Sequence, residues 1–298
     1  MTDLLIVALA GFAASMVDGA LGMGFGPTSA AILLGAGLPP TASSASINIA
    51  KVVTGLASAG AHMRAGNVNR RLALRLALPG ALGAALGAVV LLSVDPTVLR
   101  PVLAVLLLLV GVRILIRFGL EDGSQPPRRD DQDAELLVQD ADPPRGTGAA
   151  GAFGGFTNGL VGAWGPVVTP FLLHHGVAPR VAVGSVNTAE VAVAVVSVGT
   201  LLGASGGAEG LDLGIIGAML LGGVAAAPLA ARLVRRVPAR SLGLAVAGLL
   251  LLTQTRELAA AVDTPLSRWL GYGIVSLAVA VAATRPLARV RRRVRQSV

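Results

Sequence analysis

Two oppositely charged residues in apolar segments are the strongest candidates for chemistry in this sequence. Lys51, the only lysine, lies in the middle of segment 41–61, and Glu190 lies in the middle of segment 181–203. A charge at the centre of a bilayer costs at least about 2.5–3.5 kcal/mol on insertion scales, so such residues face a cavity or a partner. Two interpretations follow. Lys51 and Glu190 neutralise each other structurally, or Lys51 attracts an anion while Glu190 takes up a proton.

Polar side chains precede each of these charges by about one helical turn or less. Asn48 and Lys51 share a helix face at spacing i, i+3, as do Asn187 and Glu190. Their amide and hydroxyl groups could replace water around an oxyanion. The alternative is interhelical hydrogen bonding, which such residues commonly make in membranes. The candidate substrate-binding residues of this kind are Ser46, Asn48, Ser185, Asn187 and Thr188.

Glycine and proline interrupt two other apolar stretches, at residues 22–27 and 162–166. Pro27 and Pro166 each follow a glycine and precede an apolar run, and proline is favourable at the first helical position. We therefore expect two helix N-termini inside the membrane, whose unpaired N–H groups suit an anion. The alternative is that the glycines only permit tight helix crossing. The glycines that would let a ligand approach the backbone are Gly24, Gly26 and Gly165.

Asp18 precedes the first interruption, and Asn158 takes its place before the second. Three roles are open to Asp18: it caps the broken helix, pairs with Lys51, or carries a proton together with Glu190. The three histidines have no metal-ligand spacing and cysteine is absent. The sequence therefore predicts no metal site and no cofactor.

The composition of the chain is typical of a membrane protein. Charged residues make up 13% of its 298 residues, about half the roughly 25% usual for soluble domains. Hydrophobic residues make up 54%, aromatic residues only 3%, and there are 39 glycines. Small residues let helices approach closely in a membrane. The composition predicts an all-α polytopic membrane protein.

Apolar runs of about 20 residues are long enough to cross a bilayer. The two interrupted stretches, 4–37 and 147–176, are longer: a 34-residue helix would measure about 50 Å, against a bilayer core of about 30 Å. We expect each of them to be a broken helix or a re-entrant hairpin. The predicted simple spans are 41–61, 72–93, 98–118, 181–203, 211–231, 240–257 and 267–284.

Arginine clusters orient the spans, since cytoplasmic loops are enriched in Lys and Arg. Such clusters lie in 62–75, 232–240 and the tail 285–295, whereas loop 204–212 carries only acidic charges. The N-terminus is then outside and the C-terminus cytoplasmic, in a multi-pass protein of the plasma (inner) membrane. The formal charge is +8, but the tail has no aromatic residues to stack on bases. We therefore expect it to contact anionic lipid and not nucleic acid.

An acidic, proline-containing segment separates two halves of the chain. Residues 119–145 contain eight Asp and Glu and four Pro, a composition that cannot bury a core, so we expect a disordered cytoplasmic linker. The predicted domains are a first membrane repeat, 1–118; the linker, 119–145; a second membrane repeat, 146–260; and a last helix with a basic tail, 261–298.

The two halves repeat each other at an offset of about 139 residues. Asp18–Gly22 corresponds to Asn158–Gly162, and Ala45–Lys51 to Gly184–Glu190. Each half has a broken stretch and three spans, so the second half is inverted relative to the first. Inverted repeats with paired helix breaks indicate a transporter whose site lies at the repeat interface near the midplane.

These same residues carry a family resemblance. A glycine-rich break that ends in Gly-Pro, followed by a Ser-x-Asn-x-Ala helix, occurs twice, at Gly26-Pro27 with Ser46–Ala50 and at Gly165-Pro166 with Ser185–Ala189. The pattern resembles the sulfite exporter TauE/SafE family over nearly the whole chain. The resemblance implies a carrier of eight or nine helices that moves sulfur-containing anions such as sulfite or organosulfonates, usually outward.

We therefore expect a secondary transporter of a small anion that works by alternating access, with export and proton coupling as further expectations. A passive anion channel, a cation carrier that uses Asp18 and Glu190, and a non-transporting scaffold are the alternatives. An enzyme is not expected, because the chain has no dinucleotide fingerprint, Walker lysine or nucleophile elbow. The expected partners are the anion and the bilayer, with a homodimer left open.

Overall fold

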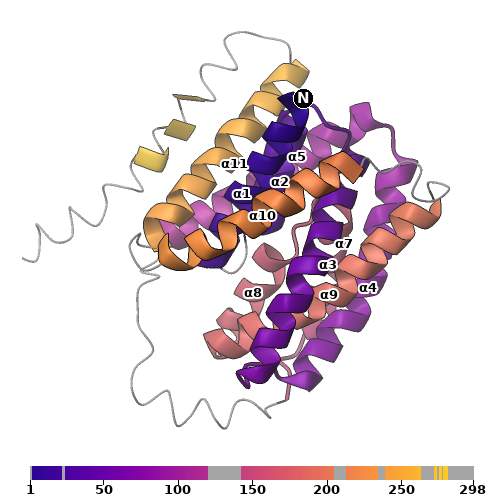
Figure 1. Ribbon diagram of the computed structural model, residues 1–298, viewed down its shortest axis with the longest axis vertical. Coiled ribbons are helices and arrows are strands. Elements are labelled where there is room, and N and C mark those ends of the chain that lie inside the picture. Colours follow the sequence, from indigo (N-terminus) through magenta and orange to yellow (C-terminus); the bar gives the residue numbers. More distant parts are fainter. Residues whose placement is uncertain are drawn as a thin grey trace, which may run out of the picture.

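The structure is a computed structural model in which residues 2–21, 24–119, 142–204, 213–233, 239–262, 272–273, 275–276 and 278–280 are described. Most of the predicted linker and of the run 267–284, the loop 204–212 beyond its first residue and the basic tail lie outside these residues. Within the described part of the chain every regular element is an α-helix, which confirms the all-α prediction (Figure 1). The helices are α1 (Thr2–Leu21), α2 (Phe25–Gly35), α3 (Pro40–Arg64), α4 (Arg70–Ser93), α5 (Pro96–Gly119), α7 (Thr147–Val161), α8 (Gly165–His174), α9 (Pro179–Ala204), α10 (Leu213–Leu233) and α11 (Ala239–Val262).

Both long apolar stretches are broken where glycine and proline interrupt them. Helix α1 gives way to α2 between residues 21 and 25, and α7 gives way to α8 between residues 161 and 165. The prediction that each proline opens its helix is wrong: Pro27 is the third residue of α2 and Pro166 the second of α8. Both helices begin earlier because Gly24 and Trp164 serve as their N-caps. The prolines still lie in the first turn, where a backbone N–H has no partner within the helix.

Gly162 makes the second break sharp. It has a φ of +70°, in the left-handed region that disfavours side chains, and a Cβ there would also collide with the side chain of Ile47. Its N–H donates to the carbonyl of Asn158 at 2.8 Å, and the N–H of Ala163 donates to the carbonyl of Thr157 at 3.3 Å. These bonds satisfy carbonyls at the end of α7. The chain can therefore turn inside the protein without leaving those carbonyls unpaired.

Helices from the two halves pack in matching combinations. The most extensive contacts join α4 to α7 and α1 to α10, followed by α5 to α11 and by α9 to α4 and α3. Figure 1 shows α1 beside α10, at opposite ends of the sequence colouring. Within each broken stretch, α1 packs on α2 and α7 on α8. The two breaks also meet, because a Cβ at Gly26 would overlap the carbonyl of Gly162.

Glycines on one face of α7 allow α4 to approach it closely. Gly151, Gly155 and Gly159 are spaced by four residues, and a Cβ at each would contact the α4 backbone. Backbones in such contact gain dispersion energy and require small residues at the interface. The high glycine content seen in the sequence therefore serves helix packing here.

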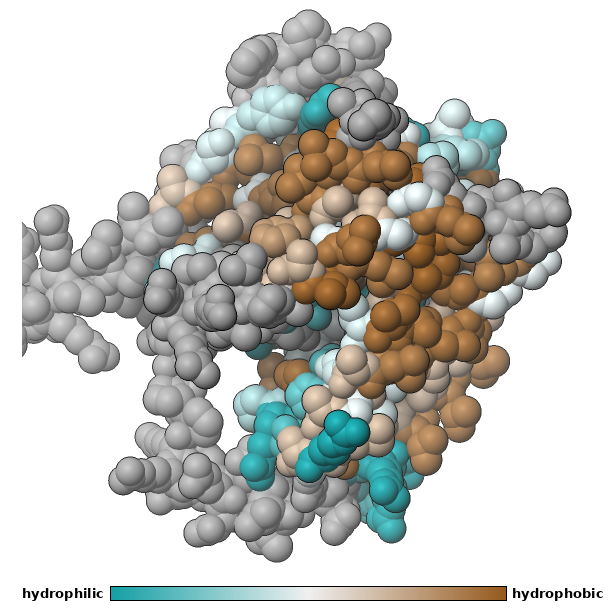
Figure 2. Space-filling model, in the orientation of Figure 1, coloured by the Kyte–Doolittle hydropathy of each residue, from teal (hydrophilic) through white to brown (hydrophobic). Residues whose placement is uncertain are grey.

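Large apolar side chains are exposed on the outer faces of several described helices. Helix α4 exposes Leu74, Leu78, Leu82 and Leu86, which form one stripe at four-residue spacing. Figure 2 shows hydrophobic surface over the middle of the molecule and hydrophilic residues gathered at its lower end. By length and apolar composition α4, α5 and α9 can cross a membrane. Apolar surface of this extent is expected of helices that face lipid.

The close approach of α4 and α7 predicts that Gly155→Ala destabilises the protein. Its methyl group would overlap the carbonyl of Gly80, and overpacking of this kind costs about 1–3 kcal/mol. We expect a lower melting temperature in detergent solution. Gly199→Ala in α9 is the matched control, since nothing lies within 4 Å of its added Cβ and alanine favours helix. Equal melting temperatures for the two variants would contradict the packing described here.

Candidate functional site

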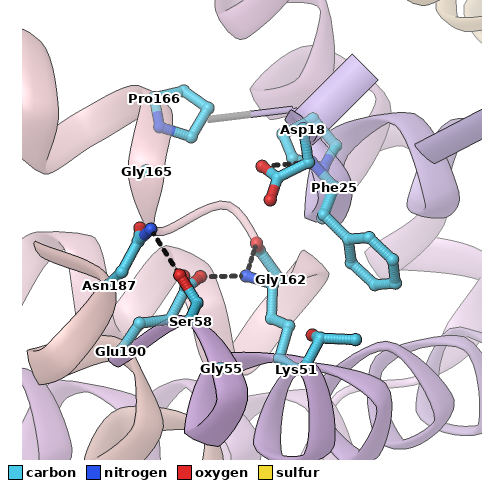
Figure 3. A pocket seen from close by; sticks show the side chains of 13 residues that line it. Asp18, Phe25, Lys51, Gly55, Ser58, Gly162, Gly165, Pro166, Asn187 and Glu190 are labelled. Atoms are coloured by element: carbon cyan, nitrogen blue, oxygen red, sulfur yellow. Dashed lines mark hydrogen bonds and ion pairs between the residues drawn. The ribbon is translucent and has the colours of Figure 1, made fainter. Parts of the chain in front are cut away.

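A cavity lies where the two helix breaks meet the facing helices α3 and α9 (Figure 3). Its volume of about 70 Å³ gives room for several water molecules or one small ion. Residues from both halves of the chain contribute to its wall, and the sequence predicts a site between the halves. The predicted site residues that line it are Asp18, Gly26, Pro27, Lys51, Gly165, Pro166, Asn187 and Glu190.

The Lys51 ammonium group is the centre of the site's hydrogen bonding. Lys51 Nζ donates to Glu190 Oε1 at 2.5 Å, to the Gly162 carbonyl at 2.5 Å and to Asn158 Oδ1 at 2.9 Å. An ammonium group has three protons, so each has an acceptor. The Lys51 side chain is 5% exposed and the Glu190 side chain 20% exposed. The two charges that the sequence singled out therefore form a partly buried ion pair.

Hydrogen bonds attach the second break, between α7 and α8, to helices α3 and α9. Asn158 Nδ2 donates to Asn48 Oδ1 at 2.6 Å and to Ser197 Oγ at 3.2 Å. Ser44 Oγ donates to the carbonyl of Gly159 at 2.8 Å. Together with the two bonds from Lys51, these contacts hold the α7–α8 break against α3 and α9.

Asp18 accepts backbone hydrogen bonds at the first break, between α1 and α2. Its Oδ1 accepts the N–H groups of Gly24 at 2.9 Å and Phe25 at 3.2 Å, so the carboxylate caps α2. Of the three roles open from the sequence, capping is the one seen in these contacts. A carboxylate at a helix N-terminus is stabilised by the partial positive charge there. The position on α2 where we expected an external anion thus holds an anionic group of the chain itself.

The charges around the cavity set a condition on what it can bind. Its titratable wall residues within the described chain are Asp18, Lys51 and Glu190, two acids and one base. With all three ionised, the wall carries a net negative charge, and Lys51 is already paired with Glu190. An anion can compete for Lys51 only if one of the acids is neutralised. This wall would hold an anion together with a proton, or a cation.

Several predicted site residues lie outside the cavity wall. Gly24 donates its N–H to Asp18, and Ser46 is buried in α3. Asn48 Nδ2 donates to the Ser44 carbonyl and Oδ1 accepts from Asn158, so this side chain ties helices together. Ser185 and Thr188 of α9 also lie outside the wall. Ser185 Oγ accepts the N–H of Asn69 at 3.0 Å, and Thr188 Oγ1 donates to the Gly184 carbonyl of its own helix at 2.7 Å.

Five wall residues were not among the predicted site residues. Phe25 and Gly162 lie at the two breaks, and Thr54, Gly55 and Ser58 follow Lys51 by three, four and seven residues on α3. Ser58 Oγ also accepts a hydrogen bond from Asn187 Nδ2 at 3.1 Å. These spacings place residues on one helix face, so the helical period counted forward from Lys51 would have found the three on α3.

Comparisons with known proteins give one family match and one related sequence of known name. The family model described as "Sulfite exporter TauE/SafE" matches residues 7–256. The chain is 36% identical over 259 residues to "Probable membrane transporter protein YtnM" of Bacillus subtilis, an alignment that covers 87% of this chain and 83% of that protein. No solved structure gives a significant match.

The buried ion pair predicts strong energetic coupling between Lys51 and Glu190. Removing one partner of a buried pair costs about 3–5 kcal/mol because the other charge is left uncompensated. We expect Lys51→Ala and Glu190→Ala each to lower stability substantially. The double variant should lose clearly less than the sum of the two, as measured by unfolding in detergent.

The exposed pair Arg71–Asp142, at 3.7 Å, is the matched control for this cycle. Exposed pairs contribute about 0–1 kcal/mol, so its cycle should show little coupling. Additive effects at Lys51 and Glu190 would show that the two charges do not interact.

Proposed function

The chain belongs to the sulfite exporter TauE/SafE family, and on that premise we propose that it is a secondary transporter of a small anion with the central cavity as its substrate site. The observation that carries the proposal is the position of Lys51, a buried cation at the junction of two broken helices. The family description names sulfite and export, so the proposed substrate is a sulfur-containing anion moved outward, sulfite or, as the resemblance in the sequence implies, an organosulfonate.

In this proposal Glu190 controls access of the anion to Lys51. An incoming anion must replace one of the three acceptors of the ammonium group, which are Glu190, Asn158 and Gly162. Glu190 is the acceptor that weakens when it takes up a proton, because it then loses its charge. Proton uptake by Glu190 would therefore free Lys51 to pair with the substrate.

Polar groups around the cavity suit the remaining oxygens of such an anion. The Asn187 amide and the hydroxyl groups of Thr54 and Ser58 line the wall next to the ion pair. Gly165 and Pro166, in the first turn of α8, line it as well. The positive end of this helix would favour negative charge in the cavity.

Alternating access would use the two halves as inverted repeats. Gly151, Gly155 and Gly159 of α7 meet Leu76, Gly80 and Ala84 in the same order, so α7 and α4 run in the same direction. Helix α7 would then enter from the arginine-rich cytoplasmic side. With the N-terminus outside and the C-terminus in the cytoplasm, α1 would enter the plasma membrane from the opposite side. Each broken helix could open and close the cavity toward its own side.

A cation carrier is the second candidate, and the wall charges favour it. Asp18 and Glu190 supply two acids against one lysine, and Asp18 already occupies the N-terminus of α2. A passive anion channel is the third, and it would differ in being unable to move its substrate against a gradient.

The proposed site predicts selective stabilisation of the purified protein by one class of anion. We would measure melting temperatures with sulfite, sulfate, thiosulfate, sulfoacetate, taurine and chloride, all as sodium salts. An anion at 100 times its dissociation constant should add about 2.7 kcal/mol to stability. Lys51→Ala should abolish the shift, measured against that variant's own melting temperature.

Arg75→Ala removes an exposed cation of α4 that does not line the cavity, so it should keep the shift. A series with the chloride salts of lithium, sodium, potassium and calcium tests the second candidate. Stabilisation by one of these cations and by none of the anions would overturn the anion proposal.

A further inference from the structure

The repeat relates Asn158 and its side-chain partners at the second break to a set of residues near the first. At the same offsets, Lys51 corresponds to Glu190 and Asn158 to Asp18. Asn48 likewise corresponds to Asn187, and Ser197 to Ser58. A second conformation with the roles of the halves exchanged would therefore place Asp18 where its counterpart Asn158 now stands.

In the observed structure the residue before the second break, Asn158, makes these side-chain contacts, and its counterpart before the first break, Asp18, does not. Asn158 contacts Lys51, Asn48 and Ser197. Asp18 instead bonds to the backbone of its own broken helix, and no hydrogen bond within the described chain joins it to Glu190, Asn187 or Ser58. Figure 3 shows Asp18 across the cavity from Glu190 and Asn187. The cavity thus lies on the side where the equivalent contacts are missing.

We propose that in the second conformation of the transport cycle Asp18 docks on Glu190, Asn187 and Ser58, and that Asp18 and Glu190 then share one bound proton. The inference rests on the proposed alternating access of this same site. It assigns the proton as the coupling ion and the pair of carboxyl groups as its binding site.

The need for a proton follows from the residue types at corresponding positions. In the observed contact an ammonium group donates to a neutral amide oxygen, Lys51 to Asn158. The exchanged contact would join two carboxyl groups, Glu190 and Asp18. Two carboxylates within hydrogen-bond distance cannot both stay ionised, so one proton is shared between them.

Other charges near Glu190 do not remove this requirement. The helices packed against α9 are α3, α4, α7 and α8, and Lys51 is the one titratable residue that their described parts contribute to the cavity wall. Exchanging the halves maps the Lys51–Glu190 contact onto itself, so Lys51 stays beside Glu190. One ammonium group against two carboxylates still leaves one negative charge, which the shared proton neutralises. The Asn187 amide and the Ser58 hydroxyl could donate further hydrogen bonds to Asp18 in its docked position.

The shared proton couples the two conformations to substrate in opposite directions. In the observed conformation Glu190 pairs with Lys51 and competes with an anion for it. In the second conformation the proton shared with Asp18 neutralises Glu190, so Lys51 is available to the anion. Loss of that proton restores the charge of Glu190, which pairs with Lys51 again and displaces the anion. Binding of the anion is therefore accompanied by uptake of one proton, and its release by loss of that proton.

The test uses Asp18→Asn in proteoliposomes that contain the full chain. The asparagine can still cap α2 through its side-chain oxygen, and it reproduces the residue type of the second half. We would load vesicles with radiolabelled sulfoacetate, whose charge is constant at neutral pH, and measure its efflux in exchange for external unlabelled sulfoacetate at two pH values, each the same on both sides. Wild-type efflux should rise by up to about tenfold for each unit of acidification, as binding of one proton with the anion requires. In Asp18→Asn the ratio of the two rates should fall to about one.

Asp95→Asn is the matched control, because Asp95 also accepts N–H and hydroxyl bonds at the start of a helix, from Thr97. The Thr97 hydroxyl and N–H bonds hold the pKa of Asp95 below its ordinary value, so the substitution removes a charge that is present at neutral pH. It lies on the exposed loop before α5, outside the cavity wall. Its efflux should keep the wild-type pH ratio.

A binding measurement covers the case in which Asp18→Asn does not transport. Sulfoacetate added to weakly buffered wild-type protein in detergent should cause net uptake of protons, and Asp18→Asn should take up none. An unchanged pH ratio or unchanged proton uptake in Asp18→Asn would overturn the proposal. So would a wild type whose exchange of sulfoacetate does not depend on pH. A wild type that neither binds nor exchanges sulfoacetate would instead count against the anion transport on which the proposal rests.

Discussion

One ammonium group inside an apolar helical protein constrains the rest of this structure. Lys51 is buried, and an unpaired charge there would be costly, so the chain must bring acceptors to it from elsewhere. The acceptors come from α9 and from both sides of the second break: Glu190, Asn158 and Gly162. Satisfying one side chain thus fixes α3, α9 and the α7–α8 junction relative to one another. The site is the place where the two halves are joined.

Glycine makes this arrangement sterically feasible. In a continuous α7–α8 helix the Gly162 carbonyl would point along the helix axis toward the N–H four residues on. At the break it accepts from Lys51 Nζ and from the N–H of Trp164. Gly26 lets the first break approach the same carbonyl closely. The glycines along α7 then bring α4 into contact. Local backbone conformation, helix packing and the chemistry of the cavity are therefore consequences of the same residues.

The sequence predicts the features that depend on periodicity and repetition. Apolar run lengths predict where the helices lie, and the repeat offset pairs Lys51 with Glu190. It does not predict which face of α3 and α9 meets the cavity, because that depends on how each helix is rotated about its axis. Asn187 faces the cavity whereas its counterpart Asn48 bonds to Asn158. The sequence likewise does not predict which of its three possible roles Asp18 takes, because capping of α2 depends on the distances from Asp18 to Gly24 and Phe25 in the folded chain.

The central claim is that the Lys51 ammonium group exchanges Glu190 for the transported anion, and nitrogen NMR of this residue tests it most directly. Lys51 is the only lysine among 298 residues, so labelling of lysine side chains with 15N gives one Nζ signal with no assignment problem. We predict that this signal shifts saturably when sulfite or sulfoacetate is added, and that chloride at equal ionic strength leaves it in place. A signal that stays unchanged at concentrations of these anions that stabilise the protein would contradict the account, because the anion would then bind without Lys51.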